Sequence, residues 1–185
     1  AIDSSIYGIM AGCIGTSNAM AADMLNMTAI GTMAHSFIES FDTEEEAFIT
    51  YAKINPSNCT LLVDTYDTLN SGLVNAIKVS NEVLAPLGAR PVAVRLDSGD
   101  LAYLSKEVRK RLDEAGYPDC KIVATNSLDE KLIASLLDQD AKIDIFGVGE
   151  NLITAKSEPV FGGVYKLVAL EKEGKIIPKI KISEN

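Results

Sequence analysis

The sequence contains no tryptophan, one histidine and only three cysteines among its 185 residues. The cysteines, Cys13, Cys59 and Cys120, are far apart and odd in number, which argues against a disulfide framework and against a zinc knuckle. No stretch approaches the roughly 20 apolar residues that span a bilayer, and the N-terminus lacks the basic and apolar regions of a signal peptide. We therefore expect a cytoplasmic protein with no membrane association and no protein-built metal site.

The sequence also lacks a block of positive charge. Its formal net charge is -9, and its richest basic stretches, 106–111 and 172–181, also contain carboxylates. This balance disfavours nucleic acid and anionic membranes as partners, although one local pocket can still hold an anionic small molecule. An apolar content of 47% with 23% charged residues is typical of a soluble globular domain.

Short apolar runs alternate with longer amphipathic segments, which predicts βα units and a parallel sheet. We expect strands at residues 13–15, 29–33, 60–64, 92–96, 121–124, 143–148 and 165–170. Helices are expected at residues 18–25, 44–54, 69–87, 101–115 and 129–137. About seven strands is close to, but short of, a closed eight-stranded barrel of about 250 residues.

Helix boundaries support this assignment. The segment 42–46 offers a cap and acidic charge at a helix start, and Gly88 and Gly116 suit helix ends. Glu173 and Gly174 predict a hairpin, so we expect a core domain at 1–170 and a hairpin or tail at 171–185. Because the chain has no initiator methionine and enters an apolar pattern at once, we expect it to be a piece of a larger protein.

Small or polar residues follow almost every predicted strand. They occupy residues 15–18, 31–36, 64–68, 95–100, 125–127 and 147–151. Because the carboxyl ends of parallel strands meet at one edge, these segments together predict a single pocket. Each one alone can equally be a helix cap, and we expect Asp100 to cap the helix that begins at Leu101.

The segment 95–100 has the densest polar chemistry. Arg95 at the end of an apolar strand needs an anionic partner, either a neighbouring carboxylate or a ligand carboxylate or phosphate. Asp97 and Asp100 can bind ribose hydroxyls or water around Mg²⁺. Gly147 and Gly149 would let backbone N–H groups approach a phosphate, with a tight turn that binds no ligand as the alternative. For the turn at 161–163 we favour a plain loop.

His35 is the only histidine, and a lone histidine more often has a structural or incidental role. Its position after a predicted strand, among small residues, weakens the case for a merely structural role. A neutral imidazole nitrogen can attack phosphorus when a carboxylate holds the other nitrogen as its N–H tautomer. Asp64, at the end of the next predicted strand, is the candidate for that carboxylate.

Six motifs in order give the sequence a family resemblance. They are Gly-Thr-Ser-Asn at 15–18, Gly-Thr-Met-Ala-His-Ser at 31–36, Leu-Leu-Val-Asp-Thr-Tyr-Asp-Thr at 61–68, Val-Arg-Leu-Asp-Ser-Gly-Asp-Leu at 94–101, Phe-Gly-Val-Gly-Glu at 146–150 and Pro-Val-Phe-Gly-Gly-Val-Tyr-Lys-Leu at 159–167. From about residue 6 to residue 170 the chain closely resembles the nicotinate phosphoribosyltransferases. The resemblance implies an irregular α/β barrel of the TIM-like, type II phosphoribosyltransferase kind, here incomplete.

The resemblance also implies roles for particular residues. His35 corresponds to a phosphorylated histidine that Asp64 orients, and Asp97 acts with them in catalysis. Arg95 and Asp97 would lie beside the pyridine and the ribose, and Gly147 and Gly149 would hold the 5′-phosphate. The remaining substrate-binding residues would be Ser17, Asn18, Thr32, Ser36, Ser98 and Asn126, the last standing where related enzymes can carry Asp.

The implied reaction belongs to NAD biosynthesis. Nicotinate displaces pyrophosphate from phosphoribosyl pyrophosphate to give nicotinate mononucleotide, with coupled ATP hydrolysis and Mg²⁺ bound to the substrate phosphates. Family members are more than twice as long and form homodimers, so we expect this fragment alone to be inactive. The alternatives are a nicotinamide or quinolinate phosphoribosyltransferase and a non-catalytic phosphate-binding barrel module. An aldolase is disfavoured because no lysine lies convincingly at a strand end.

Overall fold

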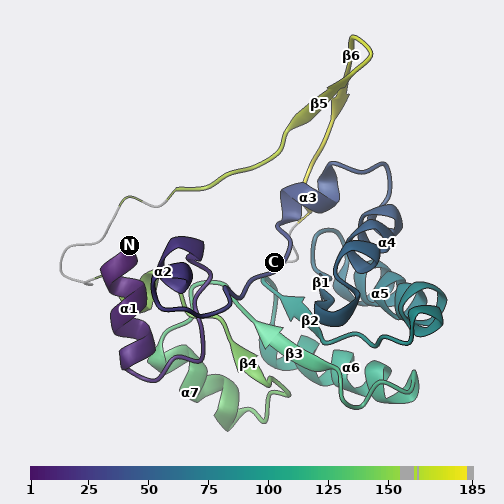
Figure 1. Cartoon of the computed structure of the whole chain (residues 1–185). Helices are drawn as coiled ribbons and strands as arrows, with labels where there is room; N and C mark the ends of the chain where they lie inside the picture. The colour runs from purple at the N-terminus through teal and green to yellow at the C-terminus, as the bar shows by residue number, and fades with distance from the viewer. Residues whose placement is uncertain (155–160, 162, 183–185) are drawn as a thin grey trace.

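A parallel β-sheet forms the centre of the molecule (Figure 1). The computed structural model describes residues 1–154, 161 and 163–182. The sheet contains β1 (Thr60–Leu62), β2 (Ala93–Leu96), β3 (Lys121–Ala124) and β4 (Ile145–Phe146), in that spatial order. Every neighbouring pair is parallel, so the predicted α/β architecture with a parallel sheet is confirmed.

Helices connect and cover these strands. They are α1 (Ile2–Met10), α2 (Ala19–Met24), α3 (His35–Glu39), α4 (Glu44–Ile54), α5 (Leu73–Val79), α6 (Leu101–Glu114), α7 (Glu130–Asp138) and α8 (Glu150–Ile153). None of the helices in the described ranges is long and apolar enough to span a bilayer.

The predicted helix boundaries have clear local causes. Thr43 caps α4 by accepting a hydrogen bond from the Glu46 N–H at 3.2 Å. Asp100 caps α6 by accepting one from the Tyr103 N–H at 3.0 Å, as expected. Gly88 and Gly116 follow helical segments with φ of 69° and 85°, a conformation that glycine adopts without strain.

The sheet has two different faces. Val94 and Leu96 of β2 and Ile122 of β3 are buried in the main core, which also contains side chains from α6. Side chains alternate along a strand, so Arg95 lies on the opposite face. Its partners in register are Leu62 and Val123, so this row forms the second face beside the functional groups.

The two earliest predicted strands, at 13–15 and 29–33, are wrong. These residues have no regular strand structure, and the Ile30 N–H bonds the Thr16 carbonyl at 2.9 Å as a single bridge between the segments. A strand needs a continuous neighbour to pair its backbone groups, and within the described residues neither segment has one. The apolar pattern also missed α1 entirely.

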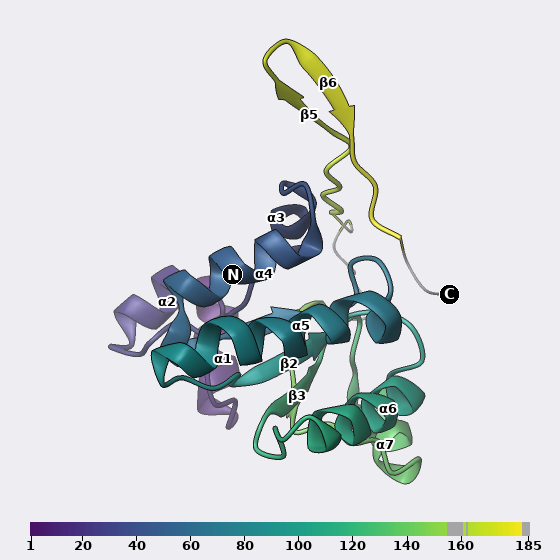
Figure 2. The same cartoon turned by 90° about the vertical axis from the view of Figure 1, so that its right-hand side faces the viewer.

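The last predicted strand is displaced along the chain. Residues 165–168 are not a strand, and β5 (Ala169–Lys172) instead pairs with β6 (Lys175–Pro178) in an antiparallel hairpin. Glu173 and Gly174 have φ of 52° and 76°, which is the geometry of a two-residue hairpin turn, so the predicted turn is confirmed. The hairpin projects away from the sheet and its helices (Figures 1 and 2). The final residues of the predicted tail, 183–185, lie outside the described part.

The helical region predicted at 69–87 is interrupted. Two π-helical turns, Thr68–Gly72 and Ser80–Leu84, flank α5, and a 3₁₀ turn (Ala85–Leu87) ends the segment. Gly72 lies so close to β1 that an added Cβ would be 1.9 Å from the Val63 carbonyl oxygen. This close approach explains why glycine occupies the junction between the first π turn and α5.

The sheet does not close on itself within the described residues, because β1 and β4 have no further strand neighbour there. The irregular barrel therefore stays a prediction.

Candidate active site

Polar side chains from the ends of β1, β2 and β3 meet in one network, as the sequence predicted. The Asp97 backbone N–H donates to the Asp64 Oδ2 at 3.1 Å, which joins the ends of β1 and β2. Thr125, directly after β3, donates its hydroxyl to the Asp97 Oδ1. The shared register of the parallel strands brings these groups together.

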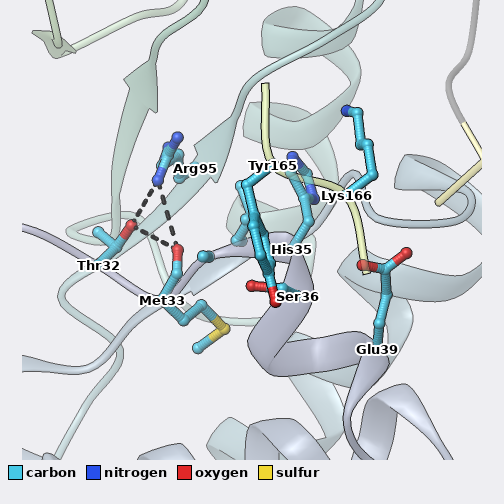
Figure 3. Close-up of a pocket in the computed structure, with 10 residues that line it drawn as sticks. Thr32, Met33, His35, Ser36, Glu39, Arg95, Tyr165 and Lys166 are labelled. Carbon is cyan, nitrogen blue, oxygen red and sulfur yellow. Dashed lines mark hydrogen bonds between the residues drawn. The ribbon is translucent and has the colours of Figure 1, made fainter. Parts of the chain in front are cut away.

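Arg95 is held by four hydrogen bonds. Its Nε donates to the Thr125 Oγ1 at 3.0 Å, and its Nη2 donates to the Asp97 Oδ1 at 2.9 Å. Its Nη1 donates to the Thr32 hydroxyl at 2.8 Å and to the Met33 carbonyl at 3.4 Å (Figure 3). The anionic partner that the sequence required is therefore Asp97, which fixes the direction of the guanidinium.

Asp97 has a strongly perturbed carboxyl group. Burial alone would raise its pKa, but hydrogen bonds from His35 and Thr125 and the charge of Arg95 outweigh burial. They hold the pKa of Asp97 well below its usual range, so this carboxylate is ionised at neutral pH. The site thus contains a fixed negative charge beside a fixed guanidinium.

His35 begins α3 and points its ring at this network. Its Nε2 lies 3.4 Å from the Asp97 Oδ2 and 3.9 Å from the Asp64 Oδ1. Its Nδ1 lies 3.1 Å from the Thr65 Oγ1. Both carboxylates therefore face the same nitrogen, whereas the sequence argument placed Asp64 at the nitrogen opposite the reactive one.

Asp64 is a buried anchor of the site, with 3% of its surface exposed. Its Oδ2 accepts hydrogen bonds from the Asp97 N–H and from the Ser98 hydroxyl. Its Oδ1 has no hydrogen-bond partner within the described residues and lies nearest to His35. Asp64 therefore orders the Asp97–Ser98 loop and presents one oxygen toward the imidazole.

A pocket of about 270 Å³ opens beside this network (Figure 3). The lining residues come from the start of α3, from the sheet and from the extended segment before β5: Thr32, Met33, Ala34, His35, Ser36, Glu39, Leu62, Arg95, Tyr165 and Lys166. Three of the predicted substrate-binding residues, Thr32, Ser36 and Arg95, therefore lie together at one pocket.

The sequence argument missed several residues at this site. Glu39 is 2% exposed, and its Oε1 accepts no hydrogen bond within the described residues. It follows His35 by four residues, so helical spacing could have placed it on the same face of α3. Tyr165 and Lys166 belong to a quoted motif but were assigned to a strand. Thr65 belongs to the predicted pocket segment 64–68, but no role was assigned to it.

Three predicted residues do not join the network. Ser17 is exposed, and Asn18 caps α2 by accepting a hydrogen bond from the Ala21 N–H at 3.1 Å. Asn126 is exposed, has a φ of 81° and accepts a hydrogen bond from Ser127. Their substrate contacts stay predictions.

Gly147 and Gly149 follow β4 at the same edge of the sheet. The Gly147 N–H donates to the Ala124 carbonyl at 2.8 Å, and an added Cβ would be 2.6 Å from the Thr125 Cγ2. Gly149 precedes α8 and would have no atom within 4 Å of an added Cβ. Close packing therefore explains Gly147 but not Gly149. The predicted turn at 161–163 includes Gly162, which lies outside the described residues.

The cysteines and metal-binding groups add little to this chemistry. Burial raises the pKa of Cys59 to about 12 and of Cys120 to about 11, as befits inert thiols. Cys13 is exposed. In the described ranges, no group of three or more His, Cys, Asp or Glu side chains is arranged to hold a metal ion.

Comparison with known proteins agrees with the sequence motifs. Residues 8–182 match the nicotinate phosphoribosyltransferase (NAPRTase) family. A nicotinate phosphoribosyltransferase of Bacillus subtilis is 47% identical over all of this chain, and one of Mycobacterium tuberculosis is 46% identical over 90% of it. The chain spans 38% and 35% of the lengths of these two relatives.

The fold agrees as well. The crystal structure of human nicotinic acid phosphoribosyltransferase superposes with a TM-score of 0.72 at 27% identity. The superposition covers 78% of this chain and 39% of the human chain. Because the family match extends over nearly the whole sequence, this chain belongs to the nicotinate phosphoribosyltransferase family.

Proposed function

We propose that this chain carries the catalytic core of an enzyme that makes nicotinate mononucleotide and pyrophosphate from nicotinate and phosphoribosyl pyrophosphate, with coupled ATP hydrolysis. The observation that carries the proposal is the contact of His35 with Asp97, 3.4 Å from Nε2 to Oδ2, in the network that also holds Arg95. A nucleophile, a fixed carboxylate and a fixed cation thus share one network of contacts in a member of this family.

Arg95 is suited to the carboxylate of nicotinate. A guanidinium has five N–H donors, and the four hydrogen bonds within the protein leave one Nη2–H for a ligand. The same bonds hold the guanidinium in place before the ligand arrives, which favours binding of a planar anion. We assign the substrate-binding role to Arg95, with Thr32 and Ser36 at the same pocket.

Asp97 is suited to the ribosyl transfer itself. Departure of pyrophosphate leaves positive charge on the ribose carbon, and an ionised carboxylate nearby stabilises that charge. The depressed pKa of Asp97 keeps it ionised for this purpose. Positioning of the two substrates supplies much of the remaining rate, and no strong base is needed.

ATP and Mg²⁺ complete the proposed chemistry. His35 would accept the phosphoryl group of ATP, with Asp64 and Asp97 beside its Nε2. Mg²⁺ would be carried mainly by the substrate phosphates and water. Gly147 and Gly149 would offer backbone N–H groups to the 5′-phosphate at the end of β4.

The complete assembly is also part of the proposal. From the family membership we infer a cytoplasmic homodimer. We also infer an irregular closed barrel, because the described sheet is open at β1 and β4 and can take further strands there. The chain spans 38% of the Bacillus subtilis relative, so we expect it to be inactive without the rest of such an enzyme. Lys166 adds a second cation to the pocket, and quinolinate has a second carboxylate, so the alternative of a quinolinate-using enzyme needs a direct test.

The phosphohistidine is tested by His35→Gln in the full-length protein. The variant is expected to lose protein phosphorylation by ATP and the coupling of ATP hydrolysis to mononucleotide formation. Ser40→Ala is the control at the opposite end of the same helix, where the Ser40 hydroxyl bonds the Phe37 carbonyl at 2.6 Å. If wild type and His35→Gln consume the same amount of ATP per mononucleotide formed, His35 is not the phosphorylated residue.

A further inference from the structure

Thr65 is a fully buried residue with an unusual neighbour. It follows Asp64 directly, its exposed fraction is 0%, and its hydroxyl oxygen lies 3.1 Å from the His35 Nδ1. A buried partner of this kind marks Nδ1 as the inward nitrogen of the ring. Nε2 lies toward Asp97, whose side chain is 24% exposed and therefore nearer the open side of the site.

The two ends of the imidazole have different partners. Nε2 faces Asp97 and Asp64, and the ionised Asp97 can only accept a hydrogen bond. A lone pair on Nε2 would be repelled by that charge, so the free neutral ring carries its proton on Nε2. Nδ1 then has the lone pair, and the Thr65 hydroxyl donates to it.

Accepting a phosphoryl group at Nε2 requires the opposite arrangement. The Nε2 lone pair forms the N–P bond while the bond from the γ-phosphorus to its bridging oxygen breaks and ADP leaves. The Nδ1 proton stays on the ring and needs an acceptor. The ring reaches this tautomer when Nδ1 gains one proton from solvent and Nε2 releases one to solvent, so no net proton is consumed.

A hydroxyl can be the partner of Nδ1 in both states, because it can donate or accept, whereas a carboxylate can only accept. We propose that Thr65 is the positioning residue of His35: its buried hydroxyl hydrogen-bonds Nδ1 in either tautomer and leaves Nε2 as the nitrogen that reacts. The claim that Thr65 hydrogen-bonds Nδ1 depends only on the contacts of His35. The claim that Nε2 reacts rests on the proposed phosphorylation of His35.

The tautomer is measured by long-range ¹H–¹⁵N NMR of the histidine ring, with His35 signals assigned by their loss in His35→Gln. In wild type, Nδ1 should be the unprotonated nitrogen and Nε2 the protonated one. Thr65→Val removes the hydroxyl at nearly constant shape and should move the Nδ1 signal downfield, while Thr65→Ser should keep it near the wild-type position. Asp97→Asn should move the Nε2 signal instead.

Phosphorylation by radiolabelled ATP in the full-length protein gives the second measurement. Loss of one buried hydrogen bond should slow labelling of Thr65→Val about tenfold, and Thr65→Ser should restore most of the rate. Backbone NMR spectra check that the variants fold, and Thr65→Ala replaces Thr65→Val if the latter does not.

The outcomes are distinct. An unchanged Nδ1 signal in the hydroxyl-free variant would overturn the role of Thr65. An unprotonated Nε2 in wild type would overturn the assignment of the resting tautomer. If Thr65→Val and wild type are labelled at the same rate, Thr65 does not position His35 for phosphorylation. If wild type is not labelled on His35 at all, the proposed function fails. The NMR measurement still shows whether the Thr65 hydroxyl hydrogen-bonds the His35 Nδ1.

Discussion

At the scale of single residues, Asp97 connects the groups of the site. Its Oδ1 accepts hydrogen bonds from Arg95 and Thr125, and its Oδ2 faces His35. Substitution of this one carboxylate therefore removes the partner of a cation, of a hydroxyl and of an imidazole together. The consequences should be visible both in stability and in its dependence on pH.

We predict that Asp97→Asn lowers the free energy of unfolding at pH 7 by about 1–3 kcal/mol, because buried donors lose a charged acceptor. The pKa of Asp97 is lowered in the folded state, so its stabilising contribution is complete above its unfolded pKa of about 4 and is lost as pH falls below that value. The difference in the free energy of unfolding between wild type and Asp97→Asn should therefore become smaller from pH 7 to pH 3.

Urea unfolding followed by circular dichroism at several pH values measures this difference. Asp119→Asn is the control, because Asp119 is an exposed carboxylate, and its difference from wild type should be small at every pH. If the difference in the free energy of unfolding between wild type and Asp97→Asn stays constant or grows on acidification, the neighbours of Asp97 do not hold its carboxylate ionised.

Single residues were predicted from sequence where a strand end made their chemistry conspicuous. Arg95 stood out because a guanidinium after an apolar strand needs an anion, and Asp97 proved to be that anion. The contact of Thr65 with His35 could not be predicted, because threonine is ordinary at a buried strand end and only the ring position of His35 gives it a role. Asn18 was selected for a pocket and serves as a helix cap.

At the scale of elements, the turn after β4 links the phosphate prediction to packing. Thr125 is fixed by hydrogen bonds to Arg95 and Asp97, so its methyl group cannot rotate away from Gly147 without breaking them. Gly149, two residues later, has open space around its Cα. The two glycines therefore make a matched pair for substitution by alanine.

We predict that Gly147→Ala lowers the free energy of unfolding by about 1–3 kcal/mol, because its Cβ would overlap the Thr125 methyl at 2.6 Å. The packing cost of Gly149→Ala should be smaller, since nothing lies within 4 Å of its added Cβ. Denaturant unfolding of the two variants measures the difference. Equal losses in the two variants would contradict the packing account of Gly147.

Elements with strong local signals were predicted well, and those that depend on distant partners were not. The helix at 44–54 has its cap and period in the sequence and has the predicted bounds. The strands expected at 13–15 and 29–33 had a plausible pattern but have no neighbouring strand. The contact of Gly72 with Val63, where the first π turn meets α5, joins segments that are apart in the sequence and is not visible locally.

At the scale of the whole molecule, the described sheet has one well-packed face and one that carries the site. The row of Leu62, Arg95 and Val123 lies on the site face, and the β5–β6 hairpin projects away from the body (Figure 2). The family resemblance anticipated a barrel, but periodicity could not say which segments close it. Closure depends on strands that pair with β1 and β4.

The most direct test of the central claim is product formation. The full-length protein is incubated with phosphoribosyl pyrophosphate, Mg²⁺, ATP and equal amounts of nicotinate, nicotinamide and quinolinate, and the mononucleotides are separated and quantified. The isolated 185-residue chain is assayed in parallel. We predict nicotinate mononucleotide as the main product of the full-length protein and none from the isolated chain. Formation of nicotinamide mononucleotide instead, decarboxylation of quinolinate, or no product from the full-length protein would contradict the account.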